Sequence, residues 1–123
     1  MTLHFHDDLD QIPQPRNQQR ILAANAQLYI DGRRFLLKLS LTPFAPPDRP
    51  NLAIATKNQK GLIVASTTVI AIHEPTLSLT LHLSTTEPGN YLTTITLYFD
   101  VDSPLHTKTL SFILPNDIPK PNE

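Results

Sequence analysis

The chain contains no cysteine among its 123 residues. This absence excludes a disulfide framework, thiolate metal sites and cysteine nucleophiles, and it fits a reducing compartment. Tryptophan is also absent, so the side chain best suited to stacking on a sugar ring is missing and carbohydrate binding is disfavoured. The chain has three glycines in total, which nearly excludes a glycine-rich loop for phosphate.

Neither sign of charge dominates, because ten basic side chains face eleven acidic ones and the formal net charge is -1. This balance predicts neither a nucleic acid nor an anionic membrane as partner. No apolar run approaches the roughly 18 residues that span a bilayer, and the first residues lack the basic and apolar regions of a signal peptide. We therefore expect a cytoplasmic protein, and the length favours one domain.

Alternation of apolar and polar residues is the most informative pattern that is present. Between residues 77 and 83 every second residue is leucine, and a second alternating run ends at Phe99. A period of two is typical of antiparallel strands with one buried face. The twelve prolines fall between the alternating runs and never inside them, as expected for residues that cannot donate to a sheet. The sequence thus predicts seven strands, at about 20–30, 33–41, 51–57, 62–72, 76–84, 90–101 and 105–114.

Two of these strands carry more specific expectations. In the first, the side chains expected on the buried face are Leu22, Ala24, Ala26, Leu28 and Ile30. Residues 17–27 also include good helix formers, with Asn17 as an N-cap, so a short helix stays open as an alternative. In the fourth strand, a bulge near Thr67 and Thr68 is considered, because it would shift the face on which later residues lie. Residues 1–17 and 115–123 are polar and without period, and we predict mobile tails on either side of a domain at 18–114.

The segment Glu87-Pro88-Gly89-Asn90-Tyr91 lies between the fifth and sixth predicted strands. It resembles the corner of immunoglobulin-like and fibronectin type III-like domains at which a tyrosine enters a strand. The resemblance implies an all-β, seven- to eight-stranded antiparallel sandwich over about residues 20–114. It also implies that Pro88 and Gly89 form the turn, and that the buried Tyr91 hydroxyl binds main chain near residues 84–88. The chain departs from antibody-type domains because it lacks their cysteine pair and core tryptophan.

Two groups of residues are candidates for binding metal. His4 and His6 would point the same way on an extended segment, and removal of Met1 would make His4 the third residue of a Cu²⁺ or Ni²⁺ site. Loop carboxylates are candidates for Ca²⁺, and these are Asp31, Asp48, Asp100 and Asp102. The alternative for both groups is an ordinary polar terminus and ordinary turn residues, and we expect no cofactor.

Apolar residues on the outward positions of strands are the best functional indication in the sequence. The candidates for a partner surface are Leu36, Ile63, Ala65, Leu92 and Tyr98. Such positions, together with open sheet edges, often mark a protein-binding surface. Burial under a loop or a tail is the alternative. Rows of threonine and serine on the outward positions are expected to be ordinary solvated strand faces.

These patterns favour a non-enzymatic protein-interaction or assembly module, because no nucleophile with a base and an orienting residue is recognisable. The expected partner is another protein, or a second copy in a homodimer, through an outer apolar face or an edge strand. The alternative is a β-sandwich that binds a metal or small ligand through the loop carboxylates or the N-terminal histidines.

Overall fold

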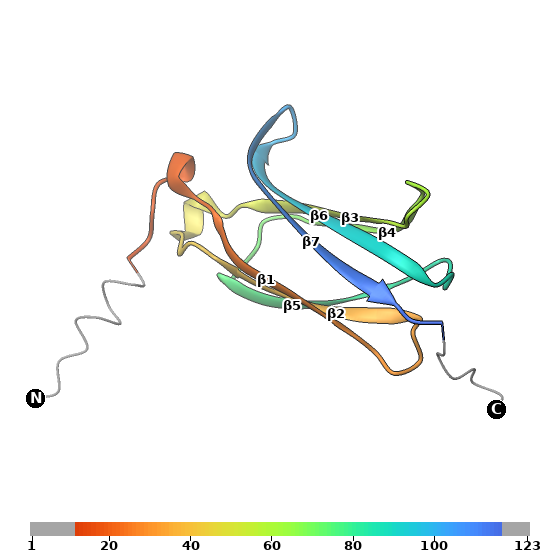
Figure 1. The fold of residues 1–123 in the computed structure, drawn as a ribbon. Helices are drawn as coiled ribbons and strands as arrows, with labels where there is room; N and C mark the ends of the chain where they lie inside the picture. The colour runs from red at the N-terminus through yellow and green to blue at the C-terminus, as the bar shows by residue number, and fades with distance from the viewer. Residues whose placement is uncertain (1–11, 117–123) are drawn as a thin grey trace, which may run out of the picture.

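Two antiparallel β-sheets pack face to face in the computed structural model, which describes residues 12–116 (Figure 1). One sheet has three strands in the order β1-β2-β5, and the other has four in the order β4-β3-β6-β7. The strands are β1 (Ile21–Leu28), β2 (Arg34–Leu41), β3 (Asn51–Lys57), β4 (Ile63–Val69), β5 (Thr76–His82), β6 (Gly89–Asp100) and β7 (Ser103–Leu114). Two short 3-10 helices, η1 (Arg16–Gln18) and η2 (Pro46–Asp48), complete the elements.

The predicted all-β sandwich is confirmed, and each of the seven strands lies within a few residues of its expected place. The helix left open over residues 17–27 does not form, since residues from Ile21 onward are extended and only η1 is helical. The core lies between the sheets. Deeply buried aliphatic residues of its two sides include Leu37, Leu39 and Leu41 on β2, Leu52 and Ile54 on β3, Ile95 and Leu97 on β6, and Leu114 on β7.

The tyrosine corner is present at the crossing from β5 to β6. Tyr91 is buried, and its hydroxyl donates a hydrogen bond of 2.6 Å to the Glu87 carbonyl oxygen, as the resemblance implies. Its ring stacks on Phe112 of β7, which in turn packs against Phe35 of the opposite sheet. Gly89 adopts φ +138°, a conformation that residues with a side chain rarely adopt, and an added Cβ would displace the end of the Gln59 side chain, whose Oε1 would lie 2.5 Å away. The turn therefore favours glycine at this position, because any other residue would be strained.

The expected inward face of β1 is wrong at both of its ends. A register shift between Ile21 and Ala23 inserts an extra residue against β2, so Ile21 is buried and Leu22 is exposed. Ala24, Ala26 and Leu28 pack against the core as expected. Ile30 lies beyond the strand in the hairpin and is 90% exposed. A bulge moves alternate residues to the other face, which a regular period of two does not reveal.

The bulge in β4 also lies elsewhere than the position considered. The register shifts opposite Thr56 and Lys57, between Ile63 and Ala65, and pairing through Thr67 and Thr68 is regular. Because of this bulge, the successive residues Val64 and Ala65 are both buried. β4 ends at Val69, earlier than expected, and Ala71 follows with a positive φ of 51°.

The division into a domain and two tails stays a prediction, because residues 1–11 and 117–123 lie outside the described part. Two residues of the predicted N-terminal tail contact the sandwich. The Gln14 N–H donates to the Pro43 carbonyl oxygen at 2.9 Å, and Arg16 pairs with Asp48 at 2.8 Å. No helix within residues 12–116 is long and apolar enough to cross a membrane.

Candidate interaction surface

The outer face of the β4-β3-β6-β7 sheet brings together apolar residues that are distant in sequence. Lys57 on β3 is the cross-strand partner of Ile63 on β4 and of Leu92 on β6. Leu92 in turn pairs with Ser111 on β7, and Ile113 follows two residues later on the same strand. Cross-strand partners, and residues two apart on one strand, share a face of a sheet. The register therefore places Ile63, Leu92 and Ile113 at one end of a single outer face.

We call Ile63, Leu92 and Ile113 the apolar patch. Their exposed fractions are 60%, 46% and 69%, so no described part of the chain covers them. Single exposed apolar side chains are ordinary, but these three lie near one end of the same outer face, with Lys57 between Ile63 and Leu92. The patch is the most pronounced apolar feature of this sheet's outer face.

The rest of this face carries small side chains in two complete rows across the four strands. One row is Thr68, Ala53, Thr96 and Thr107, and the next is Ser66, Ala55, Thr94 and Thr109. A shallow hollow of about 280 Å³ lies over part of these rows. Lys57 is the one charged residue in these two rows and the row that holds Leu92, so the face is close to neutral. It could be covered by a partner with little cost for desolvating charge.

The five residues predicted for a partner surface do not form one surface. Ile63 and Leu92 lie in one row of the described face, on either side of Lys57. Leu36 lies on the outer face of the other sheet, where it pairs with Gln27 and Thr80. Ile113 was not among the predicted residues. It lies two residues after Ser111 on the same face of β7 as Thr107, Thr109 and Ser111, and this spacing marks it as outward.

Two of the predicted surface residues are corrected because they are buried. Ala65 is 9% exposed, since the β4 bulge turns it toward the core. Tyr98 is 8% exposed and lies on a central strand between Asn51 of β3 and Pro104 of β7, where the ladder is irregular. Neither side chain is available to a partner at this surface.

The loop carboxylates do not converge. Asp100 accepts a hydrogen bond of 3.1 Å from the Asp102 N–H and so shapes the β6–β7 turn. Asp48 pairs with Arg16 on η1, while Asp31 accepts the Arg33 N–H in the β1–β2 hairpin at the other end of the strands. Within residues 12–116, no three histidine or acidic residues are grouped as metal ligands. His4 and His6 lie outside the described residues.

His106 on β7 makes a contact between the two sheets. Its Nδ1 accepts a hydrogen bond of 2.8 Å from the backbone N–H of Ile21 on β1. Burial lowers the pKa of His106, and the charges of Arg20 and Lys108 lower it further. The accepting nitrogen must be unprotonated, so the neutral imidazole holds these two edge strands together.

Comparison with known proteins gives a fold and no family. No family model matches the chain, and no curated protein matches it. Solved structures do match. The chain has an immunoglobulin-like β-sandwich fold. A Lactobacillus rhamnosus beta-glucuronidase aligns over 79% of this chain with 18% identity and a TM-score of 0.52.

Two further structures are similar in the same way. A glycosyl hydrolase family 2 member from Bacteroides cellulosilyticus aligns over 78% of this chain with 10% identity and a TM-score of 0.56. A Parabacteroides merdae beta-glucuronidase aligns over 76% with 14% identity and a TM-score of 0.50. The match covers 16%, 14% and 13% of those three chains respectively. The likeness therefore concerns one small part of each enzyme, and identities this low show the fold alone.

Proposed function

We propose that this chain is a non-catalytic protein-interaction module that binds a second copy of itself through the outer face of the β4-β3-β6-β7 sheet. The observation that carries the proposal is the apolar patch of Ile63, Leu92 and Ile113, exposed at one end of a nearly neutral face. Burying exposed apolar area is the dominant favourable contribution to protein association. The small share of the similar enzymes that this fold occupies is compatible with a supporting role.

A second copy is favoured over a different partner by the charge of the face. Lys57 is the one charged side chain in the rows that hold the patch and the small residues, so no strong field selects a partner of opposite sign. Two identical neutral faces, each with an apolar end, can pack about a two-fold axis. With strands about 4.8 Å and rows about 6.7 Å apart, the face covers on the order of 500 Å². Stable interfaces bury about 800 Å² per partner, so we expect weak association.

Strand addition, the alternative to packing through this face, is discouraged at two of the sheet edges, β7 and the start of β1. The edge strands are β1 and β5 in one sheet and β4 and β7 in the other. β7 carries Pro104, which donates no backbone hydrogen bond, and Lys108, and both residue types discourage edge pairing. The N-terminal end of β1 is engaged by His106 through the Ile21 N–H.

Sedimentation equilibrium of the full chain over a wide concentration series tests the proposal. We expect a monomer–dimer equilibrium with a dissociation constant of roughly 10–100 μM, and Ile113→Lys should weaken it by about tenfold or more. The matched control is Ile30→Lys, because Ile30 is the same residue type and is 90% exposed but lies in the β1–β2 hairpin away from the patch. A chain that stays monomeric throughout, or a dimer that both variants weaken equally, would contradict self-association through this face.

A further inference from the structure

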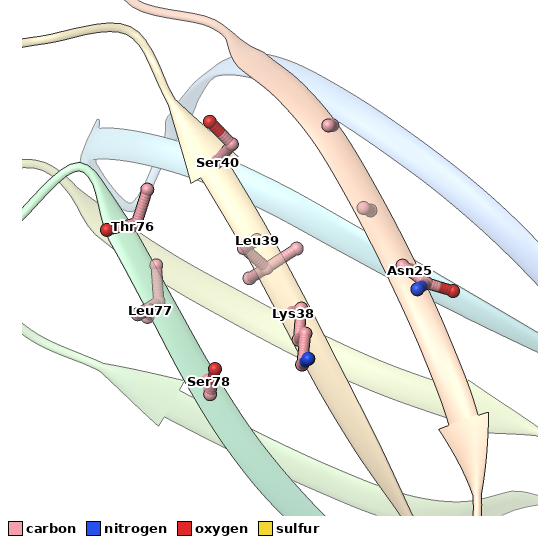
Figure 2. Close-up of a pocket in the computed structure, with 9 residues that line it drawn as sticks. Asn25, Lys38, Leu39, Ser40, Thr76, Leu77 and Ser78 are labelled. Atoms are coloured by element: carbon pink, nitrogen blue, oxygen red, sulfur yellow. The ribbon is translucent and has the colours of Figure 1, made fainter.

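A second surface feature lies on the outer face of the β1-β2-β5 sheet, away from the apolar patch. It is a hollow of about 480 Å³, lined by three consecutive residues from each strand and by none from the other sheet (Figure 2). The lining residues are Ala23, Ala24 and Asn25 of β1, Lys38, Leu39 and Ser40 of β2, and Thr76, Leu77 and Ser78 of β5. Because the opposite sheet contributes nothing, the hollow opens outward to solvent.

The hollow exists because its outward residues are mostly short. The register aligns Ala23, Ser40 and Thr76 in one row and Asn25, Lys38 and Ser78 in the next. Figure 2 shows Lys38 in the middle of this face, flanked by Asn25 on one neighbouring strand and Ser78 on the other. One cation is therefore surrounded by hydroxyl and amide groups. The volume falls within the roughly 300–1,000 Å³ typical of small-molecule sites.

The polar groups of the hollow are free to bind a ligand. Within residues 12–116, the side chains of Asn25, Lys38, Ser40, Thr76 and Ser78 form no hydrogen bond to one another or to any other described residue, and Lys38 forms no ion pair there. The cations that do form ion pairs among the described residues are Arg16, Arg34 and Lys60. No carboxylate of the described residues forms an ion pair with Lys38, the charged residue of this hollow.

The charge of the face selects the sign of the ligand. The strands β1, β2 and β5 contain no acidic residue, whereas they carry Arg34 and Lys38. Arg34 is engaged at the other end of the face, since Asp31 lies 3.5 Å from its Nε and the Tyr29 ring 4.3 Å from its guanidinium carbon. Lys38 is the one charged side chain that lines the hollow, and its positive charge favours an anion there.

We propose that this hollow binds a small organic anion that also carries hydroxyl groups. The Lys38 ammonium would meet the anionic group as a point charge with three donors. The hydroxyls of Ser40, Thr76 and Ser78 and the Asn25 amide both donate and accept, which suits a polyhydroxylated body. Exposed ion pairs are weak, so we expect a dissociation constant in the millimolar range.

Amide chemical-shift titration of the full chain with three small probes tests the proposal. Gluconate combines the carboxylate with hydroxyls, acetate has the charge alone, and glucose has the hydroxyls alone. Gluconate should cause saturable shifts at Asn25, Lys38 and Ser78, with acetate and glucose weaker by roughly three- to tenfold. Lys38→Gln should weaken gluconate by a similar factor, and Ser40→Leu should block the hollow sterically.

The matched control is Lys57→Gln, which removes an exposed lysine from the outer face of the other sheet and should leave gluconate binding unchanged. Absence of saturation at about 20 mM gluconate would overturn the proposal. Equal affinity for acetate and gluconate would overturn it as well, since it would indicate attraction to charge alone. The proposal would also be overturned if Lys38→Gln and Lys57→Gln lowered the affinity for gluconate equally.

Discussion

At the scale of single residues, the position of Tyr91 is the most specific feature that the sequence predicts. A proline and a glycine precede it, and a strand with period two follows it. The turn brings the ring into the core, and the hydroxyl then needs a partner because buried polar groups are costly when unsatisfied. The Glu87 carbonyl oxygen supplies it at 2.6 Å. Burial and hydrogen bonding at this corner are thus consequences of one short segment.

Replacing Tyr91 with phenylalanine should lower the free energy of unfolding by about 1–2 kcal/mol, because the Glu87 carbonyl oxygen loses a buried donor. Urea denaturation at 25 °C with an unchanged m-value would measure it. Tyr29→Phe is the control, since its hydroxyl lies 3.4 Å from Thr80 Oγ1 at an exposed site and should cost little. Equal losses in the two variants would show that the Tyr91 hydroxyl bond does not hold the corner.

At the scale of strands, the sequence predicts positions well and faces less well. Segmentation by proline and glycine, together with alternation in most of the runs, located the seven strands. The bulges at Leu22 and Val64 were not located, because both lie in runs of consecutive apolar residues, where the period of two does not show which residue is inserted. The unknown pairing between strands also explains why the candidate partner surface was only partly predicted. Ile63 and Leu92 were recognisable as outward residues. That they lie in the same row, on either side of Lys57, depends on the register of β3 with β4 and β6.

The pairing of β3 with β6 includes one polar contact inside the core. The Oγ1 atoms of Thr56 and Thr93 lie 2.7 Å apart, and both residues are fully buried. Thr93→Val should lower the free energy of unfolding by about 1–3 kcal/mol, since the Thr56 hydroxyl is left without a partner. The double variant Thr56→Val with Thr93→Val should recover most of that loss, because both groups then become apolar with the same shape.

Urea denaturation of the four proteins gives the coupling energy between the two threonines directly. Additive losses, with no recovery in the double variant, would mean that the hydroxyls do not depend on each other. The comparison uses valine throughout because it matches threonine in shape and does not change the volume of the core.

At the scale of the whole molecule, the two sheets present outer faces of different chemistry. The β4-β3-β6-β7 face carries Lys57 and ends in the apolar patch, while the β1-β2-β5 face is hollowed beside Lys38. Because the two faces point away from each other across the core, occupation of one leaves the other open (Figure 1). The proposed protein contact and the proposed ligand contact can therefore be tested independently in the same chain.

The sandwich is also joined along one side by His106, which couples its stability to pH. The pKa of His106 is lowered in the folded chain, first by burial and then by Arg20 and Lys108, so the unfolded chain binds the proton more readily. Stability from this group is fully present above about pH 6.5 and is lost as the pH falls through the lower, folded-state pKa. Protonated Nδ1 cannot accept the Ile21 N–H, so the contact between β1 and β7 is lost with it.

Chemical denaturation at a series of pH values between about 7.5 and 5 should show this loss, and His106→Gln should flatten the part of the slope that belongs to this residue. Glutamine offers an oxygen that accepts the Ile21 N–H without titrating, so stability at the upper pH should largely be kept. His106→Leu supplies the complementary control, because it flattens the slope and also removes the acceptor at every pH. If the glutamine variant kept the full slope of the parent chain, the pH dependence would have to arise from groups other than the contact between the sheets.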